Sequence, residues 1–228
     1  MEWSSTFGMD EVPQILEKLP PWATRAGQHR SEEEEAKYKA ARELFIRTAA
    51  EKGADAALDA LLNSDEPIDR RVGVIACGAL DRLDRLGQLF RQCKHPDLLD
   101  TAVLVLRHWI SRGPGQDQKL YQGLMSKAGF TPLQAESMLQ LLHGFDDEEL
   151  AQPETYELLI TYLTDSRLAI RALAHWQLVR LVPTGRDIAY NPLDDKDALK
   201  KAQQEWQKLV PPGKLPPKPK PVSQQRQK

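Results

Sequence analysis

Apolar residues recur every three or four positions between Tyr156 and Pro183, and this spacing limits the possible folds more than any other feature of the chain. The segment reads YELLITYLTDSRLAIRALAHWQLVRLVP. Its period is that of two amphipathic helices, joined by the turn Thr164–Asp165–Ser166. The turn supplies side-chain oxygens that can cap the second helix, and Pro183 ends that helix because proline has no N–H to donate. The segment therefore predicts a helical hairpin.

The same period predicts helices through most of the chain. Ser31-x-x-Glu34 fits a capping box at the start of a helix that continues to Gly53. Asp97 is the expected cap of a helix from Leu98 to Arg112. Further helices are predicted at about residues 54–63, 67–80, 83–93, 116–128, 132–143 and 195–210. Gly73 and Gly78 interrupt one of them and predict close approach of a neighbouring helix.

Two segments repeat one another. Residues 89–110 align with residues 159–178 when His108–Trp109 is placed on His175–Trp176. A weaker third copy covers residues 58–80. The shared core is x-L-x-x-L/F…[HS]-x-D/R-L-x-x-A-[VI]-x-x-L, which describes one helix pair for each copy.

This pattern resembles HEAT or HEAT-like repeats over about residues 55–182, although the first helices are short and the spacing is irregular. The C-terminal part has a proline-stopped helix, a connection and a Trp-bearing helix, and it is similar to the end of uncharacterised bacterial HEAT-like proteins. The resemblance implies an all-α fold, a right-handed α-solenoid of antiparallel helix pairs with capped ends. It also implies a protein-binding scaffold without shared catalytic residues.

Three regions are expected. Residues 1–30 are expected to form an N-terminal cap segment. Asp10 would cap a short helix there, whose apolar residues are Val12, Ile15, Leu16 and Leu19. The large apolar residues Trp3, Phe7 and Trp22 would dock onto the first long helix. Residues 31–210 form the HEAT-like domain. Residues 211–228 hold six prolines and five basic residues, and they are expected to be a disordered Pro/Lys-rich tail. Its P-P-K-P run fits a flexible spacer or basic tether better than a polyproline ligand.

Charge and hydropathy narrow the class of partner. The chain has 31 basic and 33 acidic residues, and five of the basic ones lie in the tail, which leaves residues 1–210 with a net charge of −7. An acidic body is a poor match for a phosphate backbone, so no nucleic acid is expected. No apolar run approaches the roughly 20 residues that span a bilayer, and the start lacks a signal-peptide pattern. We therefore expect a soluble, cytoplasmic protein without direct membrane insertion.

The residues that could carry chemistry have structural explanations. Cys77 and Cys93 lack metal-ligand spacing and are expected to be buried thiols, with a disulfide or a nucleophile as the alternatives. His108 and His175 could be a ligand or a general base, but their repetition favours a structural role. The run Glu32–Glu35 cannot converge on one ion, because successive helical residues point about 100° apart. No catalytic, cofactor-binding or metal-binding residues are predicted, and no enzyme activity or cofactor.

Five arginines are the candidate partner-binding residues: Arg107, Arg112, Arg167, Arg171 and Arg180. On stacked second helices they could form a basic ridge for an acidic peptide, and the alternative is a solvated face paired with nearby acids. The predicted function is a protein–protein interaction scaffold or adaptor that docks a segment of a protein partner of unknown identity on one helical face. The alternatives are a small helical-repeat enzyme, regulatory or glycosylase-like, and the soluble part of a membrane-linked protein.

Overall fold

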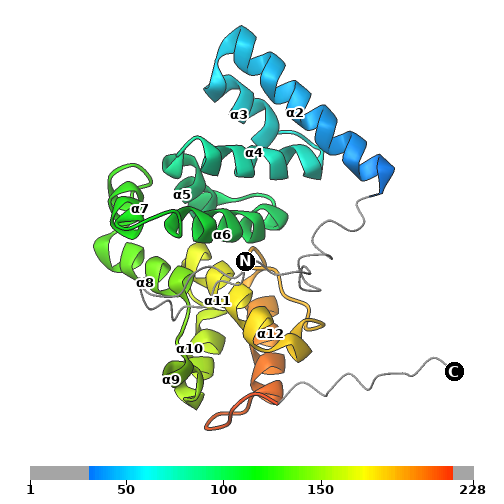
Figure 1. Ribbon diagram of the computed structural model, residues 1–228. Helices are drawn as coiled ribbons and strands as arrows, with labels where there is room; N and C mark the ends of the chain where they lie inside the picture. Colours follow the sequence, from blue (N-terminus) through cyan, green and yellow to red (C-terminus); the bar gives the residue numbers. More distant parts are fainter. Residues whose placement is uncertain (1–30, 218–228) are drawn as a thin grey trace, which may run out of the picture.

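The computed structural model describes residues 31–217, and this part of the chain is all-α, without a β-strand. The predictions for residues 1–30 and 218–228 lie outside it. Figure 1 shows the helices in successive layers, from α2 and α3 at one end to α10 and α12 at the other. The elements are α2 (Glu32–Lys52), α3 (Ala54–Leu62), α4 (Pro67–Ala79), α5 (Leu83–Gln92), α6 (Pro96–Ile110), α7 (Gln116–Ser126), α8 (Pro132–His143), α9 (Asp147–Leu150), α10 (Pro153–Tyr162), α11 (Leu168–Leu181), the 3-10 turn η1 (Pro183–Gly185) and α12 (Lys196–Leu209).

Most helix ends follow the local sequence signals. Ser31 Oγ accepts the Glu34 N–H at 3.1 Å and begins α2 as predicted, and Asp195 caps α12. Proline occupies the first turn of α4, α6, α8 and α10, where its missing N–H costs no hydrogen bond. Gly53 and Gly144 end their helices with positive φ values.

Three helix starts differ from the prediction. α6 begins at Pro96 with His95 as its N-cap, so Asp97 lies in the first turn and is not the cap. α11 has Arg167 as its N-cap and no side-chain cap, because Asp165 Oδ1 accepts the N–H of Arg167 itself, at 2.7 Å. The short helix α9 was missed, although Asp146 and Glu149 form a complete capping box there.

Glycine brings α4 close to its neighbours. A Cβ at Gly78 would lie 2.2 Å from Val105 Cγ1 on α6, and one at Gly73 would lie 3.0 Å from Leu61 Cβ on α3. Cβ atoms essentially never come within 2.2 Å of another atom, so a side chain at position 78 would require Val105 or the α4–α6 spacing to shift. The prediction of close packing at both glycines is confirmed.

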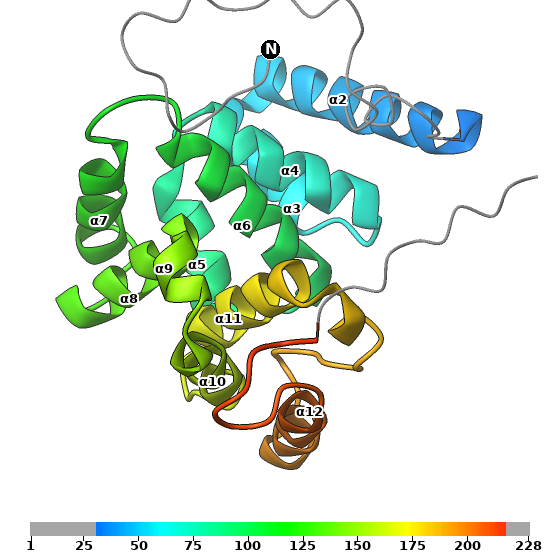
Figure 2. The same ribbon diagram turned by 60° about the horizontal axis from the view of Figure 1, so that its bottom comes forward.

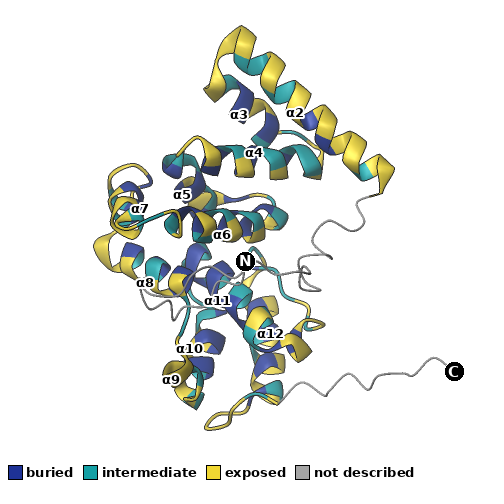
Figure 3. Cartoon of the chain, viewed as in Figure 1, coloured by how far each residue is buried: buried dark blue, intermediate teal, exposed yellow. Residues whose placement is uncertain are grey.

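Helix α11 lies at the centre of the lower layers. It packs against α5, α6, α8 and α10, and its buried side includes Ala169, Leu173 and Leu178. Figure 3 shows dark buried positions along α11 and α10, whereas α2 is exposed over most of its surface. The core is therefore continuous through the middle of the molecule and thins toward α2.

The C-terminal layer is covered by a connection and a helix. Tyr190 in the connection donates its hydroxyl to Leu163 O at 2.8 Å, and its ring lies 4.5 Å from the His175 ring. α12 packs on α10, as Figure 2 shows, and Trp206 on α12 is fully buried against Gly185. The connection therefore runs back across the α10–α11 hairpin.

The last described residues are bonded to α10. Residues 211–217 contain a turn in which the Lys214 N–H donates to Pro211 O, and the Gly213 N–H donates to Glu157 Oε1 at 2.6 Å.

Between residues 31 and 217, none of the helices combines the length and the apolar character that crossing a membrane requires.

Candidate functional site

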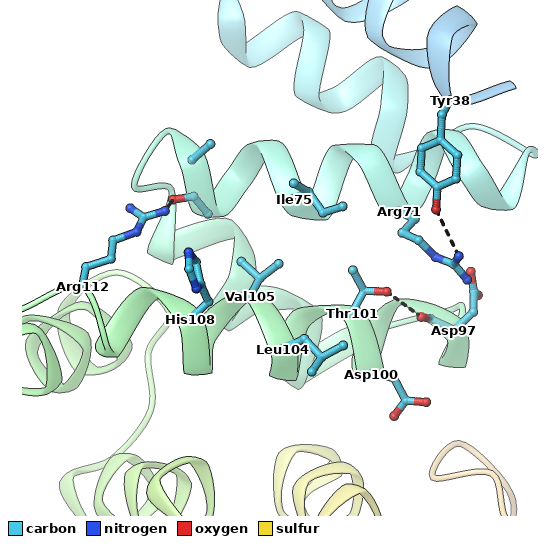
Figure 4. A pocket seen from close by; sticks show the side chains of 12 residues that line it. Tyr38, Arg71, Ile75, Asp97, Asp100, Thr101, Leu104, Val105, His108 and Arg112 are labelled. Carbon is cyan, nitrogen blue, oxygen red and sulfur yellow. Dashed lines mark hydrogen bonds between the residues drawn. The ribbon is translucent and has the colours of Figure 1, made fainter. Parts of the chain in front are cut away.

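A groove of about 790 Å³ lies along α4 and α6, with Tyr38 of α2 at one end. Figure 4 shows its side chains projecting from the two helices. Its walls combine apolar side chains in the middle with charged ones toward the ends. The lining residues are Tyr38, Arg71, Ile75, Gly78, Ala79, Asp97, Asp100, Thr101, Leu104, Val105, His108 and Arg112.

The middle of the groove is apolar and open to solvent. Ile75 of α4 is 49% exposed and Leu104 of α6 is 57% exposed, and Val105 lies beside them. Large aliphatic side chains gain roughly 1.5–3 kcal/mol each when they leave water. Two of them facing one groove therefore form a surface on which an apolar ligand would gain free energy.

Arginine residues fix both ends of the groove. At the α2 end, Arg70 donates to Asp97 Oδ2 at 3.5 Å, and Arg71 donates to the Tyr38 hydroxyl at 3.2 Å. At the opposite end, Arg112 donates to Gly78 O and to Asp81 Oδ1, both at 3.1 Å. These contacts tie the start of α4 to the start of α6, and the end of α4 to the end of α6.

Asp81 organises the Arg112 end. Its φ of 55° is in the left-handed region, which Asp tolerates better than most residues because its short side chain bonds locally. The carboxylate accepts Trp109 Nε1–H at 2.6 Å in addition to the Arg112 guanidinium. The turn after α4 thus places the Asp81 carboxylate within hydrogen-bond distance of two donors, Trp109 near the end of α6 and Arg112 just beyond it.

Charged side chains of both signs lie at the α2 end of the groove, where Arg71 accompanies two carboxylates, and Arg112 lies at the opposite end. Asp97 and Asp100 lie on the first turns of α6, and His108 and Arg112 lie at its last turn and just beyond. Asp100 reaches solvent, but the protein around its carboxyl removes part of its water and raises its pKa. Since Asp97 is also bonded to Arg70, Asp100 is the more available acid at this end.

The five predicted arginines fall into three places. Arg107 and Arg180 both lie against the Trp176 ring, with their guanidinium carbons 4.9 Å and 5.5 Å from its centroid. Arg107 also donates to the carbonyls of Leu142 and His143 at the end of α8. Burial and the charge of Arg180 lower the pKa of Arg107.

Arg167 and Arg171 lie together at the turn before α11. Arg167 forms an ion pair with Asp165 at 2.8 Å, and Arg171 donates to Asp165 O at 2.6 Å and to Pro192 O at 2.8 Å. Arg171 thereby links the turn before α11 to the connection before α12, and the Arg167 ion pair lies within the turn itself. Of the five arginines, only Arg112 lines the groove.

The two cysteines are buried, and His175 is partly buried. Cys77 and Cys93 are free and buried, as predicted, and burial raises the pKa of Cys77 to about 12. Burial also lowers the pKa of His175 to about 4. A thiol that stays protonated is a poor nucleophile, because the thiolate is the reactive form. Residues 31–217 contain no group of three or more His, Cys, Asp or Glu side chains placed to hold a metal ion.

Reasoning from arginines missed the apolar residues of the groove, Ile75 and Leu104. A signal was present in the repeats: Leu104 follows Ile75 by the same 29 residues that separate the weaker copy from the next. The later copy has Arg171 at this position, 67 residues after Leu104, just as His175 follows His108. This repeat position is thus apolar in two copies, as Ile75 and Leu104, and basic in the third, as Arg171. The difference indicates that its surroundings differ from one layer to another.

No protein-family model, curated protein or solved structure matches this chain. The function is therefore argued from the groove itself.

Proposed function

We propose that this protein is a protein–protein interaction scaffold of HEAT-like type, which binds a helical segment of a partner in the groove along α4 and α6. The helix pairs α5–α6 and α10–α11, which coincide with the two stronger sequence repeats, support the right-handed solenoid of antiparallel pairs. Such stacks present extended surfaces to partners. The proposal extends to a cytoplasmic protein that does not bind nucleic acid, in keeping with its acidic body.

The exposed apolar pair Ile75 and Leu104 is the observation that carries this function. Interfaces are anchored by a few apolar residues within a polar rim, and an amphipathic helix in a groove is a recurring mode of peptide recognition. α6 has 15 residues and is therefore about 22 Å long. The groove suits a partner helix of three to four turns, with acidic residues toward Arg112 and basic residues toward Asp100.

The runner-up is a small-molecule site or an enzyme. The groove volume lies within the range of about 300–1,000 Å³ that ligand pockets occupy, and Asp100 and His108 are titratable groups in it. They lie at opposite ends, eight residues apart on α6. The Thr101 hydroxyl donates to Asp97 O at 3.4 Å, so it is bonded to the backbone of its own helix. This arrangement favours docking of an extended segment over chemistry at one point.

The test compares two exposed leucines. Leu104→Glu places a charge in the groove, and Leu133→Glu makes the same change on α8, where Leu133 is 68% exposed and does not line the groove. Tagged full-length chains are used for affinity capture from native lysate, and a photoreactive residue is placed at position 104 or 133. We expect a stoichiometric partner with the wild type and Leu133→Glu, lost with Leu104→Glu and crosslinked only from position 104. Equal capture by both variants would contradict the proposal.

A further inference from the structure

We propose that residues 10–19 of this chain bind its own α4–α6 groove as an amphipathic helix and so compete with the partner. This inference rests on the proposed function of the groove as a helix-binding site. The segment DEVPQILEKL precedes the described region, and it is identified by three properties: its apolar spacing, its charges and the length of chain that joins it to α2.

The apolar spacing fits a helix in a groove. Val12, Ile15, Leu16 and Leu19 stand at positions i, i+3, i+4 and i+7, which place four apolar side chains on one face. Pro13 falls in the first turn after the Asp10 cap, where proline is tolerated. A helix of ten residues is about 15 Å long, which is shorter than the roughly 22 Å of α6. The segment is therefore long enough to cover Ile75 and Leu104 together.

The charges of the segment and of the groove are complementary in one direction. Asp10 and Glu11 lie at the start of the segment, and Glu17 and Lys18 lie side by side near its end, where their charges offset one another. With the segment antiparallel to α6, the acidic start lies toward Arg112 and away from Asp97 and Asp100. The reversed orientation would bring Asp10 and Glu11 to Asp100, where the carboxylates would repel one another.

The length of the connecting chain favours the same direction. Residues 20–30 join the segment to Ser31, and a chain of 11 residues can span at most about 36–40 Å. Tyr38 lies at the Asp97 end of the groove, and Ser31 precedes it by seven residues, or about 10 Å along α2. An antiparallel segment ends beside Tyr38, within reach of Ser31. A parallel one would require the connection to return along the whole groove.

The first test uses a labelled synthetic peptide of residues 9–21 and fluorescence anisotropy. The peptide is titrated with the full-length wild type and with a full-length Ile15→Asp/Leu16→Asp variant, whose own segment has lost two anchors. A tethered segment competes at an effective concentration near millimolar, so we expect the variant to bind the peptide at least about tenfold more tightly than the wild type. Adding Leu104→Glu to the variant should abolish binding, and adding Leu133→Glu should leave it unchanged. A peptide with Gln14→Ala, on the opposite face, should bind like the parent.

A photoreactive residue at position 104 of the full-length chain gives the second readout. We expect an intramolecular crosslink to residues 10–19, identified by mass spectrometry of the digested monomer. A crosslinked dimer would place the segment in the groove of a second copy and overturn the intramolecular form.

Three results would overturn the proposal outright: no peptide binding to the double variant, equal binding to variant and wild type, or binding that Leu104→Glu does not reduce. If partner capture still depends on Leu104 in any of these cases, the proposed function stands and only the self-binding segment fails. If the segment competes as proposed, the Ile15→Asp/Leu16→Asp chain should also capture more partner than the wild type.

Discussion

The helix pair α5–α6, called here the first layer, and the pair α10–α11, the second layer, derive from similar sequences but differ in what covers them. In the first layer, Leu104 is more than half exposed in a groove. At the equivalent position of the second layer, Arg171 bonds to Pro192 O and holds a connection across α11. His108 is exposed, whereas its counterpart His175 lies under the ring of Tyr190. A repeat position therefore acquires its role from the segment that covers it.

This difference has a physical reason. The repeat pattern specifies which residues pack inside a helix pair, and Ala102 and Ala169 are both buried as it requires. The outer face of each pair is specified by whatever lies against it. In the second layer the covering segment is part of the described chain, and in the first layer we propose that it is the partner protein or residues 10–19. Four substitutions test how far the two layers differ.

The largest effect is expected from Trp206→Ala, which removes the side chain that closes the second layer. Trp206 is fully buried, so the free energy of unfolding should fall by about 3–5 kcal/mol in urea titrations. Trp206→Phe should cost clearly less, because the buried indole Nε1–H has no hydrogen-bond partner among the described residues. The matched change in the open layer, Leu104→Ala, should stay within about 0.5 kcal/mol. Similar losses at both positions would remove the contrast.

His175 should make the covered layer sensitive to acid. Its pKa is lowered from 6.5 to about 4 by burial, so the unfolded chain binds a proton in that interval while the folded one does not. Stability present above pH 6.5 should therefore be lost as the pH falls toward 4, by up to about 3 kcal/mol. Unfolding titrations at pH 7, 5.5 and 4 should show a flatter dependence for His175→Gln. An unchanged slope in His175→Gln would refute the assignment.

Gly78→Ala should force α4 away from α6 and disturb the open layer. The new Cβ would lie 2.2 Å from Val105 Cγ1, and such overpacking costs about 1–3 kcal/mol. The second substitution Val105→Ala should relieve it, so that a double-mutant cycle gives a favourable coupling energy. Gly113→Ala is the control, because an added Cβ there meets no atom within 4 Å. A Gly78→Ala protein as stable as the control would contradict the close approach.

The smallest effect is expected at the Arg112 end of the groove. Asp81→Ala removes the acceptor of Trp109 and Arg112 and should cost about 1 kcal/mol, since the carboxylate is partly solvated. Asp81→Gly loses the same bonds but adopts a φ of 55° without strain, so it should be less destabilising than alanine. Unfolding in urea measures both, and equal losses would show that backbone strain is not involved.

Local signals predicted the helices well and the site poorly. Ser31, Pro67, Pro153 and Pro183 mark ends that depend on backbone hydrogen bonds within a few residues, so they can be read from neighbouring sequence. Asp97 was taken for a cap although His95 holds that position, because Pro96 extends the helix by two residues. The arginines were treated as one set from their spacing, but their partners come from segments that are distant in sequence.

The amino-acid sequence by itself determined that the described chain is helical, where most helices start and end, and that Gly73 and Gly78 admit close neighbours. These properties follow from local hydrogen bonding, the helical period and backbone sterics. Only the tertiary structure decided that Leu104 and Ile75 face an open groove while Arg171 and His175 lie beneath a connection. Exposure depends on which segment, distant in the sequence, packs against a helix face. The residues at equivalent repeat positions do not indicate which segment that is.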